Sequence, residues 1–308
     1  MPESGRACPV PVAIVIPTIH RSDFIIQQLR YYAAAEAPPA LYIGDSSIEG
    51  NHAERIRHAI DEVHGRLEVH YFHYPRQRNA VCMRNLLHEV TQPFAAYIAD
   101  DDYFVPAAVR EAAQFLESHP DYESAHGLGV VATVRADGGP DWIRITPYPQ
   151  CAVEDTTAAG RLLRFMAGYF PSYFSVHRTA GFRQAFAAID IVEENSFAEL
   201  YPCCMSIVRG RAKQLDRLYL VRQHHATRLK VPDVYDWMRE PLWLPSMNIF
   251  HQALVDEIVG RDGLTAAEAD AVVKQAFCRY LAPSITTLGR YRPASAALPA
   301  RIWRRGTG

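Results

Sequence analysis

Three consecutive aspartates, Asp100, Asp101 and Asp102, directly follow an apolar run from 94 to 99. Adjacent carboxylates repel one another, so they stay ionised together only beside a cation or hydrogen-bond donors. In a D-x-D arrangement one carboxylate can coordinate Mg²⁺ or Mn²⁺ while the remaining metal positions take diphosphate oxygens. The alternative is an acidic turn that caps the helix expected near Pro106, because aspartate is favoured at helix N-termini.

The elements that must position these aspartates alternate between strands and helices. The continuous apolar run from 10 to 16 is typical of a buried parallel strand. Further strands are predicted at 41–43, 67–74 and 94–99, separated by helices at 22–35, 52–63 and 81–90. This alternation predicts an α/β fold with a mostly parallel sheet and crossover helices.

Polar side chains follow three of these strands. Pro17 and Thr18 end the first strand, Asp45 follows the second, and the three aspartates follow the last. Ligands bind at the carboxyl ends of the strands in open α/β sheets. We therefore expect one site at this edge of the sheet.

The alternation of strands and helices ends after a helix predicted at 106–118. Runs at 127–135 and 142–146 flank Asp137-Gly138-Gly139 and predict a β-hairpin. Residues 157–210 are expected to be mostly helical, and a last strand at 214–221 leads to His224 and His225. Helices follow, one of them announced by Thr265 and Glu268 at capping-box spacing.

The order of these motifs resembles that of the family 2 glycosyltransferases with the GT-A fold. The resemblance rests on Pro17-Thr18 with Arg21, Asp45-Ser46-Ser47, Arg84-Asn85, and Asp100-Asp101-Asp102-Tyr103 with Pro106. The resemblance covers the first third of the chain and is weaker over 195–225. It implies a Rossmann-like sheet in a catalytic domain over 1–228, with a donor half (1–120) and an acceptor half (121–228). A helical C-terminal extension over 229–289 and a basic flexible tail over 290–308 would follow.

The resemblance also implies roles for residues that bind a nucleotide-sugar donor. Asp45 would accept a hydrogen bond from uracil, and Arg84 would contact the base or the diphosphate. The other donor-binding residues would be Pro17, Thr18, Arg21, Asp100 and Asp101. A turn role for Asp45 and a solvated position on a helix face for Arg84 are the alternatives. The chain departs from the family at Asn79 and Met83, where glycine and alanine are common, and at Ala99, where an aspartate often stands.

By the same resemblance, Asp102 would be the direct metal ligand, with His224 or His225 completing the site. An imidazole ligand favours Mn²⁺ over Mg²⁺. The alternative for either histidine is an ordinary surface position, since the chain has 13 histidines.

The family places its catalytic acid about ten residues before a glycine that precedes the last strand. Gly210 fixes this frame and indicates Glu199, a single carboxylate among apolar neighbours. An apolar setting suits a general base. Glu193 and Glu194 are competitors, and their alternative role is a helix start beside Asn195. Aromatic residues are candidates for the acceptor cleft, although core packing is their commoner use: Tyr169, Phe170, Tyr173, Phe174, Trp237 and Trp243.

The predicted function is that of a metal-dependent, inverting glycosyltransferase that uses Mn²⁺ or Mg²⁺ and a nucleotide diphosphate donor, with UDP favoured. The acceptor could be a glycan, a lipid-linked sugar or a small molecule. A catalytically silent nucleotide-sugar-binding protein is the main alternative. A sugar nucleotidyltransferase is disfavoured, because residues 17–21 lack the glycine needed for a triphosphate loop.

Charge and composition limit the partners and the cellular location that the sequence allows. With 32 basic and 34 acidic residues the net charge is -2, which argues against a nucleic-acid partner. The six cysteines form no C-x-x-C pair and, with no signal-peptide pattern, favour a cytoplasmic location. Residues 290–308 carry five arginines, Trp303 and no acid. A solvated tail is the first interpretation of this segment, and peripheral contact with an anionic membrane is the alternative.

Overall fold

The computed structural model describes residues 10–134, 143–225 and 233–288. Within these ranges one curled sheet of nine strands has the order β3-β2-β1-β4-β8-β6-β9-β5, and β7 also pairs with β6. The strands are β1 (Val12–Thr18), β2 (Ala40–Asp45), β3 (Val69–His73), β4 (Phe94–Tyr97), β5 (Tyr103–Phe104), β6 (Tyr122–Val134), β7 (Ile143–Tyr148), β8 (Val176–Arg178) and β9 (Arg211–His224).

The first four strands form the parallel half of this sheet. β1 pairs in parallel with β2 and β4, and β2 pairs in parallel with β3. Every residue of β1 is buried, as its apolar run predicts. Thr18 stands opposite Asp45 in the register, and Asp45 stands opposite His73. The carboxyl ends of these strands therefore meet at one edge, and the expected α/β architecture is confirmed.

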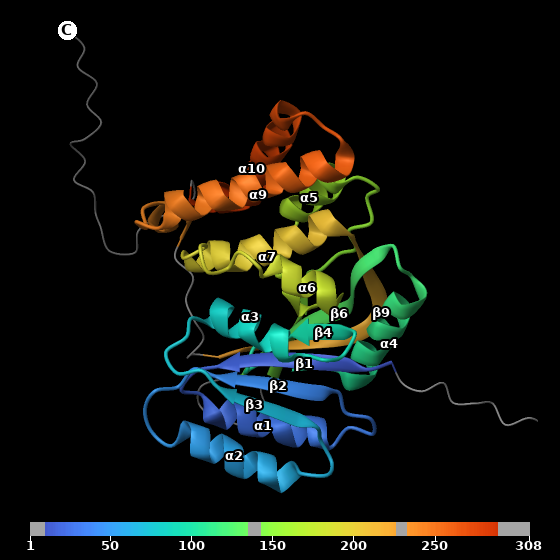
Figure 1. The fold of residues 1–308 in the computed structure, drawn as a ribbon, viewed down its shortest axis with the longest axis vertical. Coiled ribbons are helices and arrows are strands. Elements are labelled where there is room, and N and C mark those ends of the chain that lie inside the picture. The colour runs from blue at the N-terminus through green and yellow to red at the C-terminus, as the bar shows by residue number, and fades with distance from the viewer. Residues whose placement is uncertain (1–9, 135–142, 226–232, 289–308) are drawn as a thin grey trace, which may run out of the picture.

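Helices cover both faces of the sheet. α1 and α2 lie on one face, while α3, α6 and α7 lie on the other (Figure 1). α9 packs against α7, and α10 packs against α5 and α9. The helices in the described ranges are α1 (Ser22–Ala33), α2 (His52–Val63), α3 (Asn79–Glu89), α4 (Pro106–Ser118), α5 (Ala158–Ala167), α6 (Thr179–Ala185), α7 (Asn195–Arg209), α8 (Val234–Met238), α9 (Trp243–Asp262) and α10 (Ala266–Leu288), with a short 3₁₀ turn, η1 (Ser172–Phe174).

Helix α1 holds the loop that carries the three aspartates. Its buried face supplies Gln28, whose Nε2 donates to the carbonyls of Ala99 at 2.9 Å and Asp102 at 2.7 Å. The hydroxyl of Tyr32 accepts from the amide of Phe104 at 3.1 Å. The loop is thus tied to a packed helix on both sides of the triplet.

The second half of the chain differs from expectation in two places. β6 and β7 pair antiparallel as the predicted hairpin, while its turn at 135–142 lies outside the described residues. Strand β8 interrupts a region that the sequence predicts as helical, because three residues are too few to show a strand period. β9 begins at Arg211 and ends at His224, longer than the predicted 214–221, and its parallel pairing with β6 extends it.

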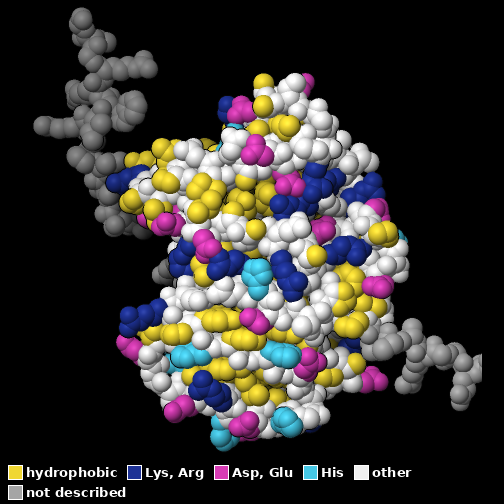
Figure 2. All heavy atoms as spheres, in the orientation of Figure 1, with side chains coloured by type: hydrophobic (Ala, Val, Ile, Leu, Met, Phe, Trp, Pro, Cys, Tyr) yellow, Lys and Arg dark blue, Asp and Glu magenta, His cyan; other side chains and the backbone are white. Residues whose placement is uncertain are grey.

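Helices α8, α9 and α10 fall in the expected C-terminal extension, and the basic segment 290–308 lies outside the described residues. No helix in the described ranges is long and apolar enough to span a membrane. On the face shown in Figure 2, acidic and basic side chains are interspersed.

Candidate active site

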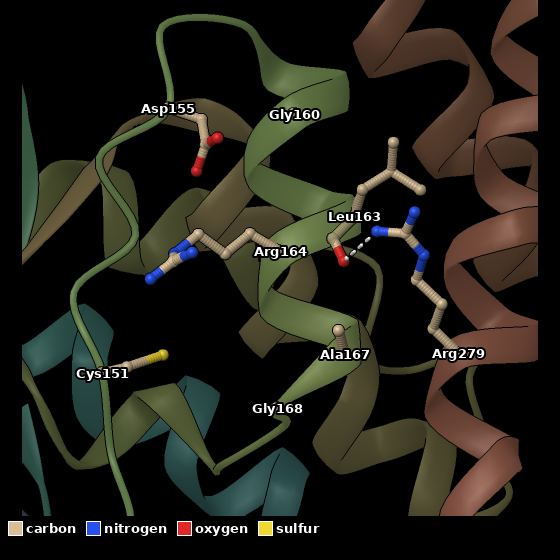
Figure 3. A pocket seen from close by; sticks show the side chains of 8 residues that line it. All are labelled: Cys151, Asp155, Gly160, Leu163, Arg164, Ala167, Gly168 and Arg279. Atoms are coloured by element: carbon tan, nitrogen blue, oxygen red, sulfur yellow. Dashed lines mark hydrogen bonds between the residues drawn. The ribbon is translucent and has the colours of Figure 1, made fainter.

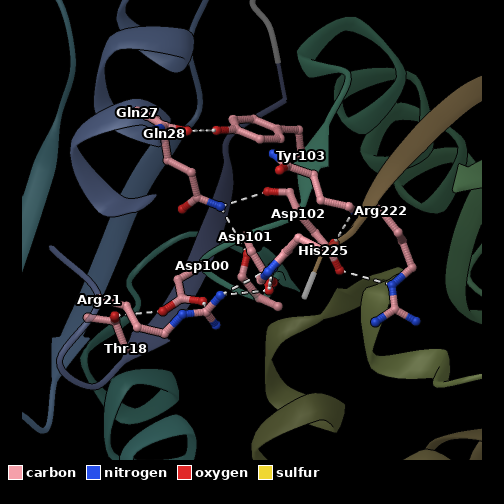
Figure 4. A network of polar contacts seen from close by, with 12 residues as sticks. Thr18, Arg21, Gln27, Gln28, Asp100, Asp101, Asp102, Tyr103, Arg222 and His225 are labelled. Carbon is pink, nitrogen blue, oxygen red and sulfur yellow. Dashed lines mark hydrogen bonds and ion pairs between the residues drawn. The ribbon is translucent and has the colours of Figure 1, made fainter. Parts of the chain in front are cut away.

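Four of the side chains predicted to bind a donor, Thr18, Arg21, Asp100 and Asp101, meet where β1 and β4 end. The hydroxyl of Thr18 donates to Oδ2 of Asp100 at 2.7 Å. The guanidinium of Arg21 bridges two aspartates, donating to Oδ1 of Asp100 at 2.6 Å and to Oδ2 of Asp101 at 2.8 Å (Figure 4). Two sequence motifs that lie about 80 positions apart in the chain therefore form one cluster. Pro17 is part of the buried strand β1.

Burial and charge affect the first two aspartates in opposite directions. Burial raises the pKa of Asp100 to about 6, although Arg21 and the hydrogen bond from Thr18 oppose it. Burial alone would also raise the pKa of Asp101, but hydrogen bonds and charges from Arg21 and His225 outweigh it and lower that pKa. Asp101 is therefore the carboxylate of this pair that is stabilised in its charged form.

Asp102, the residue expected to bind metal directly, is buried and already bonded on both carboxylate oxygens. Its Oδ2 accepts from Nε of Arg222 at 2.9 Å, and its Oδ1 accepts from the amide of Gln223 at 2.8 Å. Burial raises the pKa of Asp102, and the charge of Arg222 opposes the rise. In this arrangement Asp102 fastens the aspartate loop to β9.

Asp101, rather than Asp102, is the aspartate that reaches a histidine. Nε2 of His225 lies 2.9 Å from Oδ2 of Asp101, whereas His224 is exposed at the end of β9. No cluster of three or more His, Cys, Asp or Glu residues in the described ranges could hold a metal ion. A carboxylate and an imidazole still fit a Mn²⁺ or Mg²⁺ ion that completes its coordination with substrate phosphates and water. Of the residues expected at the site, Asp101 and His225 are the carboxylate and the imidazole that lie together, and an ion bound by both would replace the hydrogen bond between them.

Asp45 lies at the end of β2 and is fully buried. Its Oδ1 accepts from the amide of Ser47 at 2.9 Å, and its Oδ2 accepts from the hydroxyl of Tyr71 at 2.8 Å. The contact with Ser47 is the local turn that the sequence offered as the alternative role. Because Asp45 is fully buried, contact with a nucleobase would require the side chains around it, including Tyr71, to move aside.

Arg84 lies on α3, and its contacts are away from the strand-end triplet of Asp100, Asp101 and Asp102. Its guanidinium pairs with Asp190 and donates to Oδ1 of Asn85. Nearby, Arg78 donates to carbonyls in the loop that leads into α7, including those of Ile189 and Val192. The two arginines together fasten α3 to this loop.

Glu199 is half-buried on α7, and two tyrosines hold its carboxylate. The hydroxyl of Tyr169 donates to Oε1 at 2.9 Å, and that of Tyr173 donates to Oε2 at 2.7 Å. The competing carboxylates have other positions. Oε2 of Glu194 caps α7 by accepting from the amide of Phe197 at 2.9 Å, and Glu193 is exposed.

Tyr97, the last residue of β4, lies three positions before Asp100 and contacts a tyrosine that holds Glu199. The ring of Tyr97 packs edge to face against that of Tyr173, with centroids 4.4 Å apart. Burial raises the pKa of Tyr97, and the charges of Asp100, Glu199 and Asp102 raise it further. Carboxylates from both halves of the chain therefore act electrostatically on one tyrosine.

The six aromatic residues proposed for an acceptor cleft divide into those packed in the core and those that contact Glu199. Phe170, Phe174 and Trp237 are buried in the core, and Trp243 packs beside Trp237. Only Tyr169 and Tyr173 of the six contact Glu199.

Arg222 is the residue at this site that the sequence prediction missed. It is the charge that ends the apolar run 218–221, directly before the residues leading to the histidine doublet. A charged residue directly after the predicted strand 214–221 is a signal for a site, and it would have drawn attention to Arg222.

A separate hollow lies over α5 (Figure 3). Its polar side chains do not converge on one point. Arg279 donates to the carbonyl of Leu163 at 3.2 Å, and Arg164 donates to the carbonyl of Ala152 at 3.4 Å. None of the predicted site residues lines it, so the strand-end cluster is the candidate site.

No protein-family model and no curated protein matches the sequence at a significant level. Solved structures do resemble it. Residues 1–349 of S. aureus TarS in complex with UDP-GlcNAc superpose with a TM-score of 0.60 at 17% identity, covering 90% of this chain and 74% of that one. The complex of the same TarS fragment with UDP gives a TM-score of 0.56 at 18% identity, covering 90% and 73%. The chain shares its fold with these TarS structures.

The expected fold class is thereby confirmed, and at this level of identity the likeness establishes the fold alone. The longer S. aureus TarS chain gives a TM-score of 0.57 at 16% identity. The match covers 90% of this chain but 44% of that one, so the present chain spans less than half the length of this relative.

Proposed function

We propose that the chain is an inverting glycosyltransferase that moves a sugar from a nucleotide diphosphate donor to an acceptor hydroxyl. The observation that carries the proposal is that Tyr97, three residues before Asp100, packs against Tyr173, which holds Glu199, so that one ring contact connects two unlike carboxylate sites. One is the cluster of Asp100, Asp101 and Arg21 at the strand ends, and the other is Glu199. Such a reaction needs a place for a diphosphate and, facing it, a proton acceptor for the attacking hydroxyl.

Glu199 is assigned as the general base. The oxygen of the acceptor hydroxyl bonds to the anomeric carbon while the bond from that carbon to the diphosphate oxygen breaks. The hydroxyl proton passes to Glu199, and the electron pair of the broken bond remains on the diphosphate. Two tyrosine hydroxyls fix the carboxylate in place, so no reorientation is needed as the proton arrives.

Asp101 and His225 are the residues that would hold a divalent cation, Mn²⁺ or Mg²⁺. When bound, such an ion offsets the negative charge that grows on the departing diphosphate. Thr18 and Arg21 fix Asp100 and Asp101 at the strand ends, on the donor side of the site.

UDP is the proposed nucleotide, supported by the likeness to a TarS structure in complex with UDP-GlcNAc. Asp45 is proposed to accept the imide N–H of uracil once the side chains around it, including Tyr71, move aside. A carboxylate oxygen has the lone pairs for this contact.

A thermal-shift panel of nucleotide sugars, with and without Mn²⁺, tests the proposal. The donor should stabilise the chain according to its concentration relative to its dissociation constant. Release of UDP from the best binder, with and without candidate acceptors, then measures turnover. Binding without any turnover would favour a silent nucleotide-sugar-binding protein, and no stabilisation by any nucleotide sugar would contradict both.

A further inference from the structure

Arg222 lies on β9, three residues before His225, and only two of its three guanidinium nitrogens donate hydrogen bonds within the described ranges. Nε donates to Oδ2 of Asp102 at 2.9 Å (Figure 4). Nη1 donates to the hydroxyl of Tyr148 at 3.1 Å. Nη2 donates to no residue in the described ranges, and the side chain is 27% exposed. One edge of a well-anchored cation is therefore left for another acceptor.

Two aromatic rings fix the plane of this cation. The guanidinium carbon lies 4.7 Å from the ring centroid of Phe174 and 5.0 Å from that of Tyr148. Stacking of this kind stabilises a guanidinium and covers its faces. Hydrogen bonds can then leave only from its edges, which gives Nη2 a defined direction.

Arg222 also stands between the two halves of the proposed site. Its Nε holds Asp102 of the aspartate loop, and the ring against which it packs, Phe174, is adjacent in sequence to Tyr173, which holds Glu199. Burial raises the pKa of Tyr148 to about 12; the charge of Arg222 opposes this rise, and those of Glu199 and Asp102 add to it. Both carboxylates therefore act electrostatically at the residue that contacts Arg222.

We propose that Arg222 binds the diphosphate of the donor through its Nη2 edge and stabilises the charge that this group gains on leaving. The inference rests on the proposed function and extends it. A guanidinium edge matches phosphate oxygens in shape and charge. Asp102 then acts as a positioning residue, because it holds Nε and so aims the rest of the guanidinium.

Calorimetric titration of the full chain with UDP and with uridine, in Mn²⁺ and in EDTA, tests this proposal. The two ligands differ only in the diphosphate, so their affinity ratio reports the phosphate contacts. Arg222→Gln should weaken UDP binding about 10-fold or more in both buffers, the size expected for a hydrogen bond to a charged group, and should leave uridine binding unchanged. Tyr148→Phe, which keeps the charge and the ring, should cause a smaller loss for UDP alone.

Arg217→Gln is the matched control, since Arg217 lies on the same strand, is 64% exposed and pairs with Glu111. It should change neither affinity. An unchanged ratio of UDP to uridine affinity in both Arg222→Gln and Tyr148→Phe would overturn the inference, as would a loss confined to the KM of the acceptor. If Arg222→Gln does not fold, Tyr148→Phe alone decides. A wild-type chain that binds neither ligand would contradict the proposed function itself and this inference with it.

Discussion

The hydroxyl of Tyr173 donates a hydrogen bond to Oε2 of Glu199 at 2.7 Å, although the two residues come from separate elements, η1 and α7. The hydroxyl of Tyr169 holds the other oxygen at 2.9 Å. Hydroxyls that donate to a carboxylate fix its orientation and leave its remaining lone pairs for a further donor. An acceptor hydroxyl is such a donor, and this relationship makes Glu199 the first residue to test.

Glu199→Gln should lower kcat by about 10²-fold or more while changing donor affinity little. Glutamine keeps the shape of the side chain but cannot take up the proton of the acceptor hydroxyl. Steady-state kinetics with saturating donor, together with UDP titration, measure the two effects separately. Glu194→Gln is the control, because Glu194 caps α7 and should leave kcat unchanged. The reverse pattern would move the base to Glu194.

Tyr173→Phe should lower kcat by about 10-fold, less than Glu199→Gln, because the base remains but loses one of the two donors that orient it. The ring contact with Tyr97 should persist, so the melting temperature should change little. A variant with unchanged kcat would show that orientation by Tyr173 does not limit the reaction.

The metal assignment predicts different results for neighbouring aspartates. Asp101→Asn and His225→Ala should each weaken Mn²⁺ binding in the presence of UDP by at least about 10-fold, the loss that even an outer-shell change causes. Asp102→Asn should retain Mn²⁺ binding and instead weaken UDP, because Arg222 loses its anchor. The electron paramagnetic resonance signal of free Mn²⁺ reports the bound fraction. His224→Ala serves as an exposed control.

Loss of Mn²⁺ binding in Asp102→Asn, with binding retained in Asp101→Asn, would restore the ligand pair expected from the sequence. That result would require the Asp102 carboxylate to exchange Arg222 and the Gln223 amide for the ion.

Local patterns in the sequence predicted the parts of the fold that local physics determines. The apolar run of β1, the helix start at Pro106 and the capping box of Thr265 and Glu268 are confirmed, and in the last of these the Thr265 amide donates to Glu268 at 2.8 Å. These features depend on neighbours within a few residues. Helix α1 shows the limit even there, because Arg21 precedes its first turn and no side chain caps it.

The choice between Asp101 and Asp102 could not be predicted in this way. It depends on the register of β9, which brings the amide of Gln223 to Asp102 across 121 positions of sequence and leaves Asp101 facing His225. The partner of Arg84 is equally non-local, since Asp190 lies 106 positions away. Spacing along the chain identified the candidate residues, and tertiary packing determined which of them meet.

The last prediction concerns Glu123, a carboxyl group outside the site. It packs against Gly181 and Gly210, and its Oε1 has no hydrogen-bond partner in the described ranges. Burial raises the pKa of Glu123 from 4.5 to about 7, although Arg178, Arg209 and Arg261 oppose the rise. The folded chain therefore keeps this proton over a range of pH in which the unfolded chain has lost it.

Between pH 4.5 and about 7, folding takes up a proton at Glu123, so its contribution to the free energy of unfolding falls as the pH rises and is fully lost above about 7. Glu123→Gln, which mimics the protonated form, should be more stable than the wild type by roughly 2 kcal/mol at pH 8 and nearly equal to it at pH 4.5. Urea unfolding at the two pH values measures the difference. Glu117→Gln, at an exposed position on α4, is the control and should show no such dependence. If Glu123→Gln is destabilised equally at both pH values, the carboxylate is charged in the folded chain and paired with one of the three arginines.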